Sequence, residues 1–265
     1  MDNNLRIAIQ ASIEAGKRIM KVYNTGFDIE YKDDDSPLTE ADKQANDIIN
    51  TFLKPTNIPI ISEENRQTDY EIRQAWSQCW IVDPVDGTKE FIKRNGEFTV
   101  NIALALEGLP ILGVIYVPAL KTLYYADVRE GIAFKANLNE HQFELNEIIK
   151  ESNRIAPKKP NNIVQVVGSR SHMNKETLDF VESIKQNNSE VEIVSKGSSL
   201  KFCLVAEGQA DVYPRFAPTM EWDTAAGQAI CNAVGVDVIS KTTNNTLKYN
   251  KENLLNPWFM VSLKD

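Results

Sequence analysis

The chain has 265 residues and a net charge of −8, with 42% apolar and 25% charged residues. These values are ordinary for a globular protein of one large domain or two medium ones. The negative net charge argues against a nucleic-acid polymer as partner, because proteins that bind such polymers usually carry a basic face. No apolar run approaches the roughly 18 residues of a membrane span, and we expect no secretory signal at the N-terminus.

Three cysteines are present, and they are odd in number and far apart: Cys79, Cys203 and Cys231. Neither a disulfide framework nor a structural zinc site is expected from this spacing, and a reducing compartment fits best. We therefore expect a cytoplasmic protein.

In the first half of the chain, apolar residues recur at helical spacing over 5–23 and 39–53, which predicts two amphipathic helices. Short apolar runs at 58–61 and 79–82 predict buried strands that end next to acidic residues. A meander of strands follows, predicted over 100–106, 111–116, 123–128 and 132–136. We interpret residues 1–155 as an α+β half that binds metal.

The stretch 146–162 contains Pro157 and Pro160 and is the predicted boundary, since prolines break regular elements. Beyond it, residues 156–265 are expected to form an α/β half that determines substrate specificity. Its strands are predicted at 163–167, 191–195, 210–214, 236–240 and 258–262, alternating with helices at 174–186, 199–206 and 222–234. This alternation predicts a mainly parallel sheet. The expected site is the cleft between the two halves.

Two aspartates, Asp83 and Asp86, follow the apolar strand at 79–82, and a Gly-Thr pair then begins a predicted helix. Pro84 and Gly87 can bend the backbone so that both carboxylates and the Val85 carbonyl point into one small volume. Hard cations such as Mg²⁺ require this kind of all-oxygen set. The amides of Gly87 and Thr88, at a helix N-terminus, would suit a phosphate oxygen. The alternative is a solvated, aspartate-rich turn.

Three further acids stand at the ends of predicted elements. Glu63 follows the strand at 58–61. Asp42 lies in the first turn of the helix at 39–53, where a capping box with Thr39 could explain it alone. Asp223 lies at the start of the helix at 222–234, where the helix dipole could explain it. Each signal is weak by itself, but together they favour a metal site.

The acidic segments also form three motifs in a fixed order: Glu63-Glu64 after a strand, D-P-[LIV]-D-G-T at 83–88 and W-D-x-A-A-G at 222–227. With them the chain resembles the lithium-sensitive, Mg²⁺-dependent phosphatases of the inositol monophosphatase superfamily, over essentially its whole length. Longer runs are similar to one branch, the bacterial 3′(2′),5′-bisphosphate nucleotidases; they lie at 86–104, 169–172, 197–202, 204–210 and 213–216.

The resemblance implies an α/β fold, a layered αβαβα sandwich with the metal cluster at the junction of the two halves. It implies a phosphoric monoester hydrolase that acts in sulfate assimilation. The substrate would be adenosine 3′,5′-bisphosphate (PAP), with its sulfated form PAPS as a second one. It allows a monomer or a homodimer, and peripheral association with the cytoplasmic face of the inner membrane.

The resemblance also implies roles for individual residues. Two or three Mg²⁺ ions would be held by Glu63, Asp83, Asp86, Asp223 and the Val85 carbonyl. Thr88 would orient the attacking water, and Asp42 would accept its proton. The substrate would contact Glu63, Val85, Asp86, Gly87, Thr88, Gly197, Ser198, Lys201, Arg215 and Asp223.

Among the substrate contacts, Lys201 and Arg215 are the candidates for the phosphate that is not cleaved, although each could be a solvated surface charge. His172 is a candidate ribose or base contact, or else a packing residue, and Glu221 receives no role. Two alternatives stay open at this point: an inositol monophosphatase, and a PAP-binding regulator without catalysis.

Overall fold

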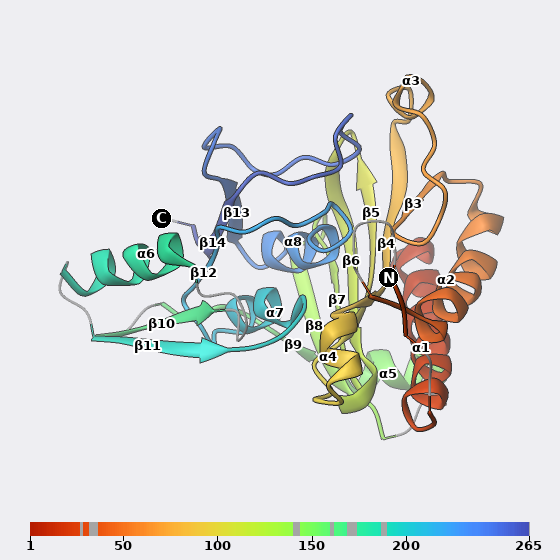
Figure 1. Ribbon diagram of the computed structural model, residues 1–265. Coiled ribbons are helices and arrows are strands. Elements are labelled where there is room, and N and C mark those ends of the chain that lie inside the picture. The colour runs from red at the N-terminus through yellow and green to blue at the C-terminus, as the bar shows by residue number, and fades with distance from the viewer. Residues whose placement is uncertain are drawn as a thin grey trace.

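The computed structural model describes residues 1–26, 29–31, 37–139, 144–159, 162–168, 174–186 and 190–264. Three helices form its first layer: α1 (Asn3–Tyr23), α2 (Glu40–Leu53) and α5 (Leu145–Glu151). Both long helices are amphipathic, and α1 buries its apolar stripe from Leu5 to Val22. This layer covers one face of a large sheet and forms the first core with it (Figure 1).

The large sheet is the second layer and has seven strands within the described residues, in the order β3-β4-β5-β6-β7-β8-β9. Only β3 and β4 run parallel; the other neighbours are antiparallel, as a meander requires. Its strands are β3 (Ile60–Ser62), β4 (Gln78–Asp86), β5 (Thr99–Leu106), β6 (Leu109–Val117), β7 (Thr122–Asp127), β8 (Ile132–Asn137) and β9 (Asn153–Arg154).

Two short helices, α7 (Leu200–Ala206) and α8 (Ala225–Asn232), form the middle layer. They lie between the large sheet and a second sheet, and every residue of α7 is buried. Gly113 in β6 lets α8 approach closely, because a Cβ at this position would lie 2.6 Å from the Ala226 carbonyl oxygen. The second core, around this layer, therefore belongs to both sheets.

The second sheet has the strand order β11-β10-β12-β14-β13. Helix α6 (Lys175–Gln186) covers its outer face and completes a small third core with Val166, Val181 and Val212. The strands are β10 (Ile163–Gly168), β11 (Glu190–Ser195), β12 (Val212–Arg215), β13 (Val236–Ser240) and β14 (Phe259–Leu263). The five layers confirm the predicted αβαβα sandwich (Figure 1).

The prediction of a mainly parallel second sheet is wrong for its C-terminal part. Strand β10 pairs parallel with β11 and β12, but β14 pairs antiparallel with β12 and with β13. No helix connects β13 to β14 in the structure, so the chain returns without the crossover that parallel neighbours need.

The remaining elements are short: β1 (Ile29–Tyr31), β2 (Pro37–Thr39), α3 (Tyr70–Arg73), α4 (Thr88–Ile92) and 3₁₀ turns at Lys54–Thr56 and Pro118–Leu120. The predicted boundary at 146–162 contains most of α5 and all of β9, so regular structure extends further into it than expected. Among the described residues, no helix has both the length and the apolar character that crossing a membrane requires.

Candidate metal and phosphate site

A bulge at the end of β4 places the two aspartates of the central motif. Asp83 pairs with Asn101 of β5, and Asp86 pairs with Thr99, so three steps along β4 match two steps along β5. Residues three apart on a regular strand point to opposite faces, and one extra residue reverses this. Strand β4 therefore continues through Asp86, beyond the predicted end at residue 82, and the Val85 amide donates to Asp83 Oδ1 across 3.0 Å.

Asp223 comes to the same point from the second half of the chain. It lies just before α8, which begins at Ala225 rather than at the predicted residue 222. The Met220 amide donates to Asp223 Oδ2 across 2.7 Å and so fixes the carboxylate. One carboxylate oxygen each of Asp83, Asp86 and Asp223 lies within 4.8 Å of the others.

The three carboxylates have the electrostatics of a cation site. Burial and the charges of neighbouring acids raise the pKa of Asp83 well above its usual value. Burial, with Asp86 as the next cause, raises the pKa of Asp223 to about 7. No described Lys or Arg forms an ion pair with any of the three. Arg215 offsets the charge of Asp223 only in part, since the pKa of Asp223 is still raised. An all-oxygen acidic set of this kind fits a hard divalent cation such as Mg²⁺.

Glu63 and Val85 border the same cluster. Glu63 follows β3, and its amide donates to the Val82 carbonyl across 3.1 Å, which ties it to β4. Its charge is among the causes that raise the pKa of Asp83. The Val85 carbonyl accepts a hydrogen bond from the Thr88 hydroxyl across 3.3 Å. Of the five predicted metal ligands, the structure brings the carboxylates of Asp83, Asp86 and Asp223 together, while Glu63 and the Val85 carbonyl lie beside this cluster.

Asp42 serves both its helix and the site. Its Oδ2 accepts from the Thr39 amide across 2.8 Å and from the Thr39 hydroxyl across 2.6 Å, which forms the predicted capping box. Its Oδ1 accepts from the Thr88 hydroxyl across 3.3 Å. Gly87, with φ of +91°, turns the chain from β4 into α4 and so presents Thr88 to Asp42.

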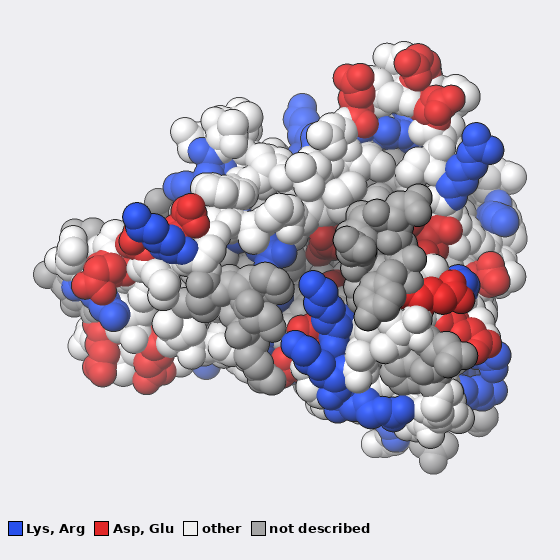
Figure 2. Space-filling model, in the orientation of Figure 1, with Lys and Arg blue, Asp and Glu red and all other residues white. Residues whose placement is uncertain are grey.

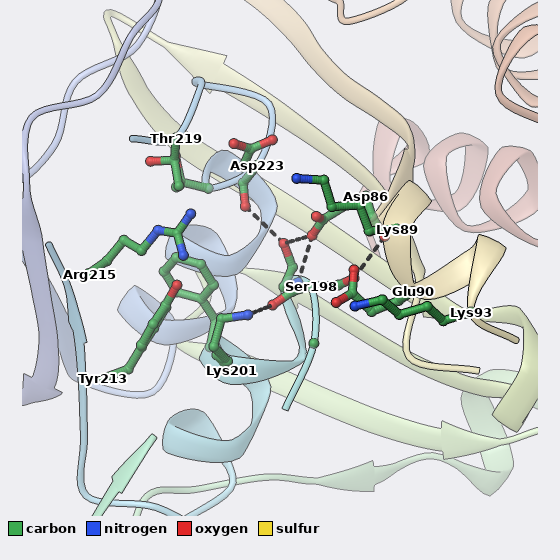
Figure 3. A pocket seen from close by; sticks show the side chains of 15 residues that line it. Asp86, Lys89, Glu90, Lys93, Ser198, Lys201, Tyr213, Arg215, Thr219 and Asp223 are labelled. Carbon is green, nitrogen blue, oxygen red and sulfur yellow. Dashed lines mark hydrogen bonds between the residues drawn. The ribbon is translucent and has the colours of Figure 1, made fainter. Parts of the chain in front are cut away.

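A cavity of about 350 Å³ opens beside Asp86 and Asp223. Figure 3 shows Asp86 and Glu90 on one side of it, together with Lys89 and Lys93, and the side chains of Lys201, Tyr213 and Arg215 on the other. In Figure 2, Lys and Arg atoms gather at the centre of the visible face, next to Asp and Glu atoms. The cavity thus joins the cluster of acids to a cationic wall.

Both cations of this wall are held by main-chain carbonyls. Lys201 is 6% exposed, and its Nζ donates to the Ser198 carbonyl across 2.6 Å. Burial lowers the pKa of Lys201 to about 8. Arg215 donates through Nη2 to the Pro218 carbonyl across 2.9 Å, while its buried Nε has no hydrogen-bond partner among the described residues. A buried donor without an acceptor lowers the stability of the fold unless a ligand supplies the acceptor.

The loop before α7 reaches across to the first half. The Gly197 amide donates to Glu97 Oε2 across 2.9 Å, so this amide is engaged within the protein. The Ser198 hydroxyl lies 2.8 Å from the Asp86 carbonyl oxygen and 2.7 Å from that of Glu97. Both residues line the cavity, as predicted for substrate contacts.

Some cavity residues received no individual role from the sequence, although all except Thr219 lie in runs that carry the resemblance: Lys89, Lys93, Ser199, Tyr213 and Thr219. The four-residue spacing of Lys89 and Lys93 on one face of α4 could have indicated the first two. His172, with the rest of 169–172, lies outside the described residues.

Residues 1–257 match the inositol monophosphatase family. The chain is 46% identical over 259 residues to the 3′(2′),5′-bisphosphate nucleotidase CysQ of Salmonella typhimurium, an alignment that covers 96% of this chain and 97% of that protein. A crystal structure of CysQ from Bacteroides thetaiotaomicron has a TM-score of 0.89 and 47% identity, and covers 100% of this chain and 98% of that one.

A more distant structure, the extragenic suppressor protein suhB from Bartonella henselae, has a TM-score of 0.74 at 22% identity, with 97% of this chain and 92% of that chain covered. It shows the same fold. Together these similarities confirm the resemblance that the sequence motifs indicated.

Proposed function

Because this chain belongs to the inositol monophosphatase family, we propose that it is a Mg²⁺-dependent 3′(2′),5′-bisphosphate nucleotidase that converts PAP to AMP. The observation that carries the proposal is the cavity that links the three-aspartate cluster to Lys201 and Arg215. A substrate with two separate phosphates can occupy both ends of it. The likeness to CysQ nucleotidases supports the same assignment.

The metal ligands are Asp83, Asp86, Asp223, Glu63 and the Val85 carbonyl, and they hold two or three Mg²⁺ ions. Mg²⁺ supplies positive charge that stabilises the phosphoryl group in the transition state and lowers the pKa of water. The role of the protein is to place ligands from both halves around one point, since positioning determines much of the rate of phosphoryl transfer.

Thr88 and Asp42 handle the proton of the attacking water. The Thr88 hydroxyl orients the water and takes a proton from it, while it passes its own hydrogen to Asp42 Oδ1, 3.3 Å away. Asp42 is 2% exposed, so bulk water does not compete with Thr88 for it. The capping box fixes the other carboxylate oxygen and thereby the orientation of the whole group.

Lys201 and Arg215 bind the phosphate that is not cleaved. Arg215 offers its unpaired Nε, and Lys201 offers a charge that is already desolvated. Hydrogen bonds between these charged groups and a phosphate are stronger than hydrogen bonds between neutral groups. Gly87 and Ser198 line the cavity between the two phosphates, and Thr88 contacts the substrate from the start of α4. PAPS, which carries the same 3′-phosphate, is a second substrate, and we place the enzyme in sulfate assimilation in the cytoplasm.

The test is phosphate release from PAP and, in parallel, from inositol 1-phosphate, with Mg²⁺ and with EDTA. Mg²⁺-dependent release that strongly favours PAP is the expected result. A preference for the inositol ester would overturn the roles of Lys201 and Arg215 but keep the metal site. Binding of PAP without any release would instead identify a regulator.

A further inference from the structure

Ser199 touches a proposed metal ligand from each half of the protein. Its hydroxyl oxygen lies 2.7 Å from Asp86 Oδ2 and 2.8 Å from the main-chain oxygen of Asp223. The Ser199 amide donates to the same Asp86 Oδ2 across 2.6 Å. Ser199 is 1% exposed, so water does not replace these contacts.

A chain of side chains from β5 orients this hydroxyl. The Thr99 hydroxyl donates to Asn101 Oδ1 across 2.9 Å, and Asn101 Nδ2 donates to Ser199 Oγ across 2.9 Å. A hydroxyl that accepts in this way keeps its single hydrogen for another acceptor. The single hydrogen of Ser199 therefore lies between the Asp86 carboxylate and the Asp223 main-chain oxygen, or points at one of them.

Ser199 does not cap the helix that follows it, although a serine at this position usually does. Ser199 is the residue before α7, where a serine side chain normally accepts a hydrogen bond from an amide of the first turn. Here Ser199 has helical φ and ψ of −70° and −4°, and its side chain makes no capping hydrogen bond. Its hydroxyl is directed at the acidic cluster instead.

We propose that Ser199 is a positioning residue of the metal centre. Its hydroxyl holds the Asp86 carboxylate from β4 at a fixed distance from the Asp223 segment, and so joins the two halves of the ligand set. The inference rests on the proposed metal role of these aspartates, but it does not depend on which phosphate ester is hydrolysed. Outer-shell partners of this kind change metal affinity about 10–100-fold when removed.

The experiment is calorimetric titration of Mg²⁺ into the full chain without nucleotide, with the Ser199→Ala variant compared with the parent protein. We expect the Kd for Mg²⁺ to rise about 10-fold or more. Ser12→Ala is the matched control, because Ser12 is also fully buried and its hydroxyl makes one 2.8 Å bond, to the Ile9 carbonyl within α1. This control should leave the Kd unchanged.

A second readout separates positioning from general damage. The Mg²⁺ concentration for half-maximal turnover should rise in Ser199→Ala, while the KM for nucleotide at saturating Mg²⁺ stays within about twofold. An unchanged Kd for Mg²⁺ in a folded Ser199→Ala protein would overturn the proposal.

If Ser199→Ala does not fold, Ser199→Cys takes its place, since a thiol is only a weak hydrogen-bond donor; here too an unchanged Kd overturns the proposal. Asn101→Ala is not used, because Asn101 Nδ2 also donates directly to Asp86 Oδ2 across 3.3 Å. A parent protein that binds Mg²⁺ but releases no phosphate from PAP contradicts the proposed substrate alone. The Ser199 result then still stands.

Discussion

The Thr88 hydroxyl donates to Asp42 Oδ1 across 3.3 Å, although the two residues are 46 positions apart in the sequence. The other oxygen of the same carboxylate holds the N-terminus of α2 through Thr39. One buried side chain thus anchors a helix and reaches the start of α4. The two roles can be separated experimentally.

Asp42→Asn should lower kcat for PAP by about 10²–10⁴, the usual contribution of a positioned general base. The melting temperature should fall little, because the amide oxygen can still accept from Thr39. Steady-state kinetics and thermal denaturation measure the two effects. Asp47→Asn, on the exposed face of α2, is the control and should change neither. A retained kcat with a lower melting temperature would leave Asp42 only its capping role.

Arg215→Ala should raise KM for PAP about 10–100-fold, since it removes a charge-assisted contact worth roughly 1.5–3 kcal/mol. The KM for inositol 1-phosphate, which has no second phosphate, should change little. Arg154→Ala, an exposed arginine at the edge of the large sheet, is the control. Equal effects on both substrates would contradict a role for Arg215 in binding the second phosphate.

The pKa of Lys201, about 8, predicts how substrate binding depends on pH. The ammonium is charged below about pH 8, so KM for PAP should rise as the pH passes this value. Lys201→Met should have a high KM that no longer changes between pH 7 and 9.

The lowered pKa of Lys201 also makes the stability of the folded protein depend on pH. The folded-state pKa of Lys201 lies below its ordinary value of 10.5, so between about pH 8 and 10.5 the unfolded chain binds a proton that the folded chain lacks. The contribution of this group to the free energy of unfolding therefore increases with pH in that window. Urea titrations of the parent protein and Lys201→Met at pH 8 and 10 would measure it, and equal changes in both would contradict the shift.

Mg²⁺ should stabilise the folded protein, and Asp83→Asn should remove this effect. A ligand at about 100 times its Kd adds about 2.7 kcal/mol to the free energy of unfolding. Without metal, Asp83→Asn should be at least as stable as the parent protein, because the parent keeps a buried carboxylate with a raised pKa. Asp237→Asn, in β13, should respond to Mg²⁺ as the parent does. A full Mg²⁺ response in Asp83→Asn would place the ion elsewhere.

Glu221, which received no role from the motifs, should be one of the main supports of the C-terminal segment. It is 0% exposed and accepts from the Asn250 amide across 2.6 Å, the Lys251 amide across 3.0 Å and Lys251 Nζ across 2.5 Å. Glu221→Ala should lower the free energy of unfolding by about 3 kcal/mol, since it leaves these donors unpaired. Urea denaturation would measure it, with the exposed Glu252→Ala as control. A loss under about 1 kcal/mol would contradict this role.

Periodicity predicted most elements of the fold, including α1, α2 and the meander from β5 to β8, because their apolar patterns are local. The pairing of β14 was not predicted, since strand direction depends on how residues 241–258 return across the sheet. The bulge between Asp83 and Asp86 was also missed, because it depends on the register with Asn101 and Thr99.

For the site, the sequence predicted the convergence of Asp83, Asp86 and Asp223, because their motifs stand at the ends of elements. Ser199 was placed at the start of a helix and in the run at 197–202, but it received no role of its own. Its partners, Asn101 and Asp86, are 98 and 113 positions away, so no local pattern could show the contact.

The middle layer of α7 and α8 also limits how this protein can change during evolution. Both helices come from the second half, yet they cover the face of the large sheet that carries Ile81, Ala103 and Ile115. A chain cut at residue 155 would give one fragment with a bare apolar sheet and another with two uncovered helices. The halves are therefore not exchangeable modules, and new substrate preferences must arise from single changes along the cavity wall rather than by recombination of whole halves.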